Sequence, residues 1–161
     1  MAKRVYLNLD KCCGCKSCAA ACYYSHHHQA LLGHSRVLEA ANLPLHCLHC
    51  SQPSCAAACP NLAMQKREPD GLVLRSEYMC VGCKSCAAAC PFGVINNSLK
   101  KHIVPKCNLC QEKTIPGGRP RCVAACTSGA LTFEEENQVA GEKDKVLLST
   151  RMRSFAVGRR R

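Results

Sequence analysis

The chain has 161 residues, of which 17 are cysteine, four are tyrosine, three are phenylalanine and none is tryptophan. So few aromatic residues argue against an ordinary large hydrophobic core, and the fold must be held together by disulfides or by metal sites. The formal net charge of +11 at pH 7 would suit a nucleic acid or an acidic partner, unless bound groups offset it.

Disulfides are the first explanation to exclude. The cysteine count is odd, and the N-terminal residues 1–5 carry no apolar export segment and no twin-arginine signal. No stretch reaches the length of a transmembrane helix. We therefore expect reduced cysteines, a cytoplasmic location and no membrane span, although a partner that bears a signal could still carry the chain across a membrane.

Regular secondary structure is predicted to be sparse. Apolar residues alternate with polar or amphipathic ones over 5–9, which predicts a short strand. We expect a helix within 23–41. The sequence Glu-Pro-Asp-Gly at 68–71 is a turn signal, so 64–75 is predicted to form a β-hairpin. Residues 131–133 are predicted to form a closing strand.

Repetition dominates the sequence. The segment 15–22, Cys-Lys-Ser-Cys-Ala-Ala-Ala-Cys, recurs letter for letter at 83–90, and diverged copies of its end stand at 55–59 and 122–126. The alanine-rich ends fit single helical turns, since alanine is the best helix former. Four groups of cysteines result: Cys12, Cys15, Cys18 and Cys22; Cys47, Cys50, Cys55 and Cys59; Cys80, Cys83, Cys86 and Cys90; Cys107, Cys110, Cys122 and Cys126.

The spacing within these groups is typical of 4Fe–4S clusters. The first and third groups read C-x2-C-x2-C-x3-C, while the second widens one gap to x4 and the fourth widens it to x11. In two-cluster ferredoxins three cysteines of such a run hold one cluster and the fourth ligates the other. Gly14 and Gly82 would let the backbone approach the cluster. The sequence predicts four 4Fe–4S clusters on sixteen cysteines, and leaves Cys13, outside the spacing, as a non-ligand.

Other classes of protein fit less well. Zinc ribbons use two C-x-x-C pairs without the trailing x3 cysteine, so a zinc-bearing nucleic-acid module is disfavoured. Four clusters that carry about −2 each when oxidised would offset most of the positive charge, which weakens the case for nucleic acid. An iron–sulfur transcription sensor would need a recognition helix, and we find none. No phosphate loop or other catalytic motif is present, so catalysis is expected on a partner.

Several basic and histidine residues stand outside the cysteine groups. The histidines are interpreted as surface or cluster-adjacent side chains, with tuning of cluster potentials or binding of another metal as the alternative. Lysines and arginines could dock an acidic partner or could be solvated charge. These residues are His26, His27, His28, His34, His46, His49, Lys100, Lys101, Arg151, Arg153, Arg159, Arg160 and Arg161. Residues 135–161 are predicted to be a C-terminal tail that docks a partner or is flexible.

With this layout the sequence resembles the four-cluster ferredoxin-like electron-transfer subunits of molybdenum and tungsten oxidoreductases, formate dehydrogenases, hydrogenases and carbon monoxide dehydrogenases. The resemblance covers residues 3–135. It rests on the four quartets, on the x11 gap between Cys110 and Cys122, and on 70–73 ahead of Cys80. The length is most similar to that of the small soluble members.

The resemblance implies an α+β fold of two nested ferredoxin-like domains with little regular secondary structure. Residues 1–42 plus 105–134 would form one domain with groups one and four, and 43–104 would form the inserted domain with groups two and three. Sequential pairing of the groups is the alternative. The implied ligand sets are Cys12, Cys15, Cys18 and Cys126; Cys22, Cys107, Cys110 and Cys122; Cys47, Cys50, Cys55 and Cys90; Cys59, Cys80, Cys83 and Cys86.

The family also implies a function. We expect an electron-transfer subunit that links the catalytic subunit of an oxidoreductase to a second partner such as a flavin subunit or a ferredoxin. A tungsten or molybdenum aldehyde oxidoreductase or formate dehydrogenase is the favoured catalytic partner. Alternatives are a subunit of carbon monoxide dehydrogenase or hydrogenase, and a free polyferredoxin. Two exposed terminal clusters would let copies stack into longer chains.

Overall fold

The computed structural model describes residues 3–26, 33–38, 41–95, 97, 104–111, 118–135 and 145–146. Its elements are short and follow the chain in the order β1 (Lys3–Asn8), α1 (Ser17–Ser25), β2 (Gly33–Leu38), β3 (Ala41–Leu45), α2 (Ser54–Ala57), β4 (Met64–Lys66), β5 (Val73–Arg75), α3 (Ser85–Ala88), α4 (Arg121–Ala124), β6 (Leu131–Glu135) and β7 (Lys145–Val146). The expected mixture of few helices and few strands is therefore present.

Three small antiparallel sheets are formed. One has the strand order β6-β1-β7, with Val5 opposite Phe133 and Leu7 opposite Val146, and the other two are the hairpins β2–β3 and β4–β5. The predicted strands at 5–9 and 131–133 and the predicted hairpin at 64–75 are confirmed. Strand β7 falls within the predicted tail, so two residues of that tail add an edge strand to the first sheet.

The expected helix within 23–41 is wrong over 33–38, while 27–32 and 39–40 lie outside the described residues. Helix α1 ends at Ser25, and Gly33–Leu38 is a strand that pairs with β3. Gly33 and the β-branched Val37 are poor helix formers, and the hairpin satisfies the backbone amides and carbonyls of this segment instead. Strand β3 was not predicted.

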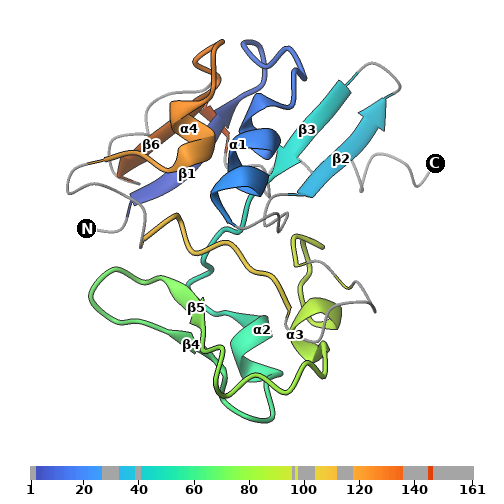
Figure 1. The fold of residues 1–161 in the computed structure, drawn as a ribbon, viewed down its shortest axis with the longest axis vertical. Helices are drawn as coiled ribbons and strands as arrows, with labels where there is room; N and C mark the ends of the chain where they lie inside the picture. The colour runs from blue at the N-terminus through green and yellow to red at the C-terminus, as the bar shows by residue number, and fades with distance from the viewer. Residues whose placement is uncertain are drawn as a thin grey trace.

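Helices from distant parts of the sequence lie together in pairs. Helix α1 packs against α4, and α2 packs against α3. In Figure 1 the upper half holds α1 and α4 with β1 and β6, and the lower half holds α2 and α3 with the β4–β5 hairpin. The helices of cysteine groups one and four therefore share one half, and those of groups two and three share the other.

Two small apolar cores lie among the described residues, and cysteines form part of both. In one, Val5, Leu7 and Leu131 pack with the buried thiol of Cys122, and Leu72 of the β4–β5 hairpin joins them from the lower half. The core of the lower half contains Met64, Val73, Cys86, Ile95 and Val104. Because these cores are small, groups bound by the cysteines would add much of the stability.

Polar contacts join the two halves. The guanidinium of Arg4, on β1, donates hydrogen bonds to the carbonyl oxygens of His49 and Gly71, both at 3.4 Å. Asp70, in the hairpin turn, accepts a hydrogen bond from the side-chain amide of Gln111 at 3.2 Å and forms an ion pair with Arg67. The β4–β5 turn is thus held against the N-terminal strand.

Candidate metal centres

The loops at the start of the two identical cysteine segments have the same backbone conformation. Gly14 and Lys16 have φ of 67° and 63°, and Gly82 and Lys84 have φ of 70° and 66°. Left-handed backbone of this kind suits glycine and is uncommon for lysine. Helices α1 and α3 begin directly after these two loops. The repeated letters therefore specify a repeated loop that wraps three cysteines around one space.

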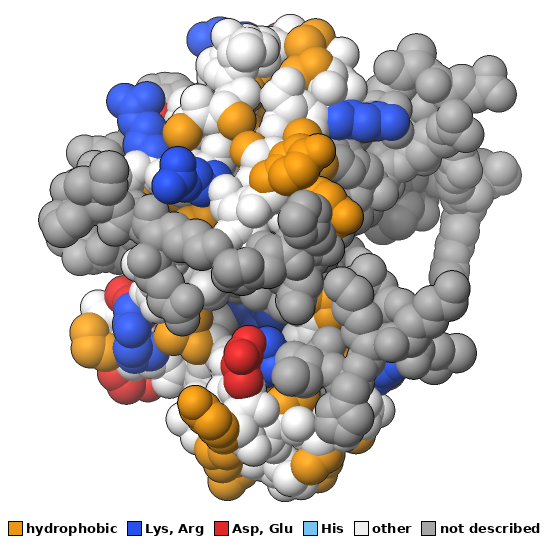
Figure 2. Space-filling model, in the orientation of Figure 1, with side chains coloured by type: hydrophobic (Ala, Val, Ile, Leu, Met, Phe, Trp, Pro, Cys, Tyr) orange, Lys and Arg blue, Asp and Glu red, His pale blue; other side chains and the backbone are white. Residues whose placement is uncertain are grey.

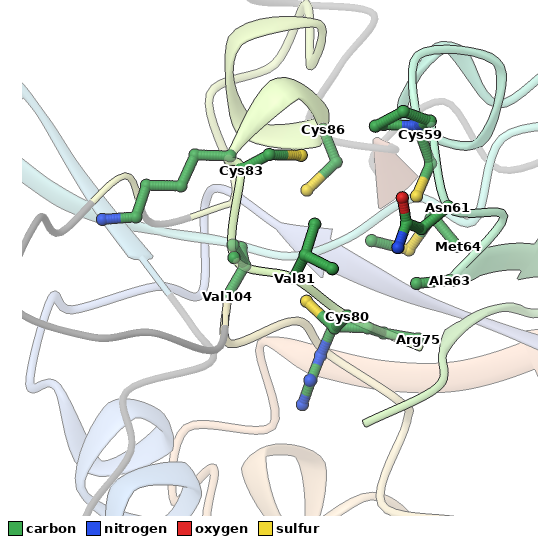
Figure 3. A pocket seen from close by; sticks show the side chains of 13 residues that line it. Cys59, Asn61, Ala63, Met64, Arg75, Cys80, Val81, Cys83, Cys86 and Val104 are labelled. Atoms are coloured by element: carbon green, nitrogen blue, oxygen red, sulfur yellow. The ribbon is translucent and has the colours of Figure 1, made fainter. Parts of the chain in front are cut away.

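One cavity lies beside α3 in the lower half. Cys59, Cys80, Cys83 and Cys86 line it together with apolar residues such as Met64 and Val104. Figure 3 shows Cys83 and Cys86 on one side of this cavity and Cys59 on the other. Cys59 belongs to the segment that follows α2. The space amounts to about 340 Å³, including the part open to solvent.

A second cavity in the lower half is lined by Cys47, Cys50, Cys55 and Cys90. The space amounts to about 350 Å³, including the part open to solvent, and Val73, Ile95 and His49 are among the other residues that line it. Three of the four cysteines come from the second group and one comes from the end of the third.

The corresponding cavity of the upper half is lined by Cys12, Cys15, Cys18 and Cys126, and measures about 340 Å³. The backbone N–H of Leu131 donates to the sulfur of Cys126 at 3.4 Å. Cys13 also lines this cavity and is exposed. The cavity is therefore surrounded by the four cysteines of one predicted set and by the cysteine that the spacing predicts to be a non-ligand.

The cysteines of the remaining predicted set lie mostly in the interior. Cys22, Cys110 and Cys122 are buried, and Cys107 is half-buried. Burial raises the pKa of the Cys122 thiol far above its usual range, and the neighbouring Cys107, Cys110 and Cys22 raise it further. The imidazole of His26 lies 3.4 Å from the sulfur of Cys110. These thiols therefore sit close enough to share one bound group.

The four sets follow one another along the molecule. Helix α1 carries Cys18 of one set and Cys22 of the next. Cys47, of the third set, lies close enough to Cys107, of the second, to raise its pKa by charge repulsion. The lower pair of sets meets at the contact between α2 and α3. Neighbouring sets are thus linked by single helical turns and close thiols.

Burial has a strong electrostatic effect on these thiols. It raises the pKa of Cys55 to about 11 and that of Cys107 to about 12. By contrast, the hydroxyl of Ser17 lowers the pKa of the exposed Cys15 to about 7. Several buried thiolates in one place need a strong positive countercharge, and bound iron supplies one.

The linings of the cavities suit an inorganic group bound through sulfur, since each of the three is lined by the four cysteines of one predicted set together with apolar residues. Among the residues that the structure describes, no three His, Cys, Asp or Glu side chains converge tightly enough to hold one metal ion. Cysteine thiolates around an apolar cavity are the donor set that iron–sulfur clusters require.

Two buried polar side chains accompany the cysteines of the second cavity. His49 is 2% exposed, and its Nδ1 accepts a hydrogen bond from the backbone N–H of Val73 at 3.0 Å. Lys106 is buried, and its ammonium donates to the carbonyl oxygens of Val73 and Cys107. His49 is among the histidines that we interpreted from the sequence as surface or cluster-adjacent. Lys106 was not predicted, although the position of this lysine next to Cys107 could have indicated a place near a cluster.

Only some of the other histidine and basic residues singled out from the sequence fall within the described residues. His46 is buried beside Cys47, and His26 contacts Cys110. His27, His28, Lys100, Lys101 and the arginines of 151–161 lie outside the described residues, as does the side chain of His34. None of the described helices has the length and hydropathy of a membrane span.

The comparison with known proteins decides the family. Residues 38–136 match the model of the 4Fe–4S dicluster domain. The chain is a member of this family. It is 32% identical over 146 residues to one component of the anaerobic dimethyl sulfoxide reductase of Shigella flexneri, and the match covers 80% of this chain and 71% of that protein.

Two further relatives are similar over shorter regions. The beta subunit of the selenate reductase of Thauera selenatis is 44% identical over 91 residues, which cover 56% of this chain and 28% of that protein. One component of the sulfite dehydrogenase of Allochromatium vinosum is 36% identical over 101 residues, which cover 59% of this chain and 42% of that protein.

Membership in the 4Fe–4S dicluster domain family confirms the main predictions from the sequence. The chain is a small ferredoxin-like α+β protein that carries 4Fe–4S clusters, and its seventeen cysteines are compatible with four of them. It serves as an electron-transfer subunit of an oxidoreductase complex and is not catalytic alone.

Proposed function

We propose that sixteen cysteines hold four 4Fe–4S clusters in the four sets predicted from the family, and that Cys13 is not a ligand. The observation that supports this most strongly is the grouping of the cysteines. Three of the sets each line one cavity, and three of the four cysteines of the remaining set are buried. Each cluster, when bound, would supply a site that accepts or releases one electron.

We further propose that the chain consists of two nested ferredoxin-like domains, 1–42 plus 105–134 and the inserted 43–104. The packing of α1 against α4 and of α2 against α3 supports this division. Strand β6 extends to Glu135, so the first domain would end at that residue or beyond it. Residues after 135 would then serve partner docking, apart from the two that form β7.

The chain's own residues would conduct electrons by fixing the bound groups close together and keeping water away from the inner two. Cysteines of the two inner sets are mostly buried or half-buried, whereas Cys15 and Cys83 of the outer sets are exposed. Electrons would therefore enter and leave at the two outer sets. The fully exposed side chain of Tyr78 and the exposed Val81, which lines the Cys59 cavity, would offer a contact for a partner at one end.

The exposed surface agrees with contacts to proteins at the ends. Figure 2 shows hydrophobic side chains at the end that α2 and α3 form, and Lys and Arg side chains of the described residues spread over both halves. A redox partner needs a close approach to the outer cysteines, and exposed apolar side chains at an interface core favour such an approach.

One partner would be the catalytic subunit of a molybdenum or tungsten oxidoreductase. The relatives are named as parts of enzymes that act on dimethyl sulfoxide, selenate and sulfite. Small sulfur or selenium compounds that the enzyme would reduce or oxidise are therefore a substrate class to test. They stand beside the aldehyde or formate that the sequence favoured. The second partner would be a flavin subunit, a ferredoxin or a membrane-bound subunit, and the complex would lie in the cytoplasm.

Anaerobic purification of the tagged chain from its own cells, with identification of the proteins that accompany it, tests this proposal. A catalytic oxidoreductase subunit in stoichiometric amount, whose reduction by substrate passes electrons to this chain, is the expected result. Isolation of the chain alone, reducible by several enzymes, would instead favour a free polyferredoxin. Cell fractionation tests the location.

A further inference from the structure

His49 combines a defined hydrogen-bond state with an unusual position. The backbone N–H of Val73 donates to its Nδ1 at 3.0 Å, so Nδ1 bears a lone pair and no proton. The imidazole is therefore neutral, and its one proton is on Nε2. Nε2 is buried and has no hydrogen-bond partner within the part of the chain that the structure describes.

An unpaired buried N–H is costly, so native proteins nearly always provide an acceptor for it. His49 lines the cavity that Cys47, Cys50, Cys55 and Cys90 surround. The wall also includes apolar residues such as Val73 and Ile95, which offer no side-chain acceptor, and Ser54, whose hydroxyl makes no hydrogen bond with Nε2. The acceptor that would satisfy Nε2–H is a sulfur of the group held in this cavity.

The position of the ring is fixed from several sides. His49 has φ of 47°, in the left-handed region, and it stands between two of the cysteines in the sequence. Its carbonyl oxygen accepts a hydrogen bond from Arg4, and Val73 holds its Nδ1. A side chain held this firmly presents its remaining N–H in a defined direction, as the residues around metal sites do.

We propose that His49 donates a hydrogen bond from Nε2 to the 4Fe–4S cluster held by Cys47, Cys50, Cys55 and Cys90, and thereby raises the reduction potential of that cluster. The inference rests on the ligand set proposed above. A hydrogen bond to sulfur stabilises the negative charge that an added electron brings, and hydrogen bonds of this kind are among the factors that set cluster potentials.

Redox titration of the anaerobically purified protein, followed by EPR, tests the proposal with the variant H49N. Asparagine can still accept from the Val73 N–H, but it places no donor where Nε2 stood. We expect one cluster to shift to a lower midpoint potential while the iron content stays at the wild-type value. The variant H49Q, whose amide reaches the Nε2 position, should shift less. The control H26N changes a histidine beside Cys110, in another set, and should leave the midpoint potential of the cluster beside His49 unchanged.

Equal midpoint potentials in the wild type and H49N, with iron retained, would overturn the proposal. If H49N loses iron, wild-type and H26N/H46Q proteins labelled with ¹⁵N-histidine are reduced and measured by pulsed EPR, since His26 also lies beside a cysteine sulfur. A ¹⁵N coupling that persists in H26N/H46Q supports the proposal. No coupling in either protein, or a coupling lost in H26N/H46Q, overturns it. A wild-type protein without any cluster signal would instead refute the proposed function itself.

Discussion

Arg4 Nη2 donates a hydrogen bond to the carbonyl oxygen of His49 at 3.4 Å and so joins strand β1 to the loop of the second cysteine group. The same guanidinium reaches the carbonyl oxygen of Gly71 in the hairpin turn. Arg4 and His49 are 45 positions apart in the sequence. One arginine thus ties the N-terminal strand, which is part of the upper half, to two loops of the lower half.

We predict that R4M weakens the attachment of the two halves. Carbonyl oxygens of His49 and Gly71 would lose a charged donor, which costs about 1–3 kcal/mol in unfolding free energy. Anaerobic denaturation followed by circular dichroism measures the change. The control R119M removes an exposed arginine and should cost much less. Equal losses in the two variants would contradict the structural role of Arg4.

Lys106 places a buried positive charge between two cysteine sets. Its ammonium donates to the Cys107 carbonyl oxygen at 3.2 Å, and its charge also acts on Cys50 and Cys55. We predict that K106M lowers the midpoint potentials of the two inner clusters, because a nearby cation stabilises the reduced state. K106R keeps the charge and should shift them less. Redox titration followed by EPR measures both, and unchanged potentials in K106M would be evidence against this role.

Cys13 and Cys15 form a matched pair, since both are exposed and both line the same cavity. We predict that C13S keeps all four clusters, with about sixteen iron atoms per chain, whereas C15S damages one. Iron analysis of the two anaerobically purified variants decides the matter. Loss of iron in C13S, with full iron in C15S, would show instead that Cys13 is the ligand and Cys15 is not.

The pairing of the cysteine groups can be tested by comparing three variants. Under nested pairing C18S and C126S perturb the same cluster signal, because both residues line one cavity. Under sequential pairing Cys18 would share its cluster with Cys59, so C18S and C59S would perturb the same signal. EPR spectra of the three reduced variants distinguish the two, and identical changes in C18S and C59S would rule out nesting.

Much of the cysteine chemistry could be predicted from the sequence because it depends on local spacing. Loops such as 12–18 and 80–86 are built from adjacent residues, and glycine marks their left-handed positions. Strand β1 and the 64–75 hairpin carried alternation and turn signals of the same local kind. These features need no knowledge of distant contacts.

Features that depend on distant parts of the chain were not predictable in this way. Segment 33–38 lacks a strong pattern, and its partner β3 makes it a strand. Lys106 stands beside Cys107 in the sequence, but its burial and its hydrogen bond to Val73 depend on a strand 33 residues away. The tautomer of His49 likewise depends on a backbone amide 24 residues away.

Four 4Fe–4S clusters are proposed to carry the electrons along this chain. Iron and acid-labile sulfide in the anaerobically purified protein, measured together with the EPR spectrum after reduction, test this claim most directly. We predict a brown protein with about sixteen iron and about sixteen sulfide per chain and with signals from reduced clusters. A colourless protein with bound zinc and no labile sulfide would contradict the claim.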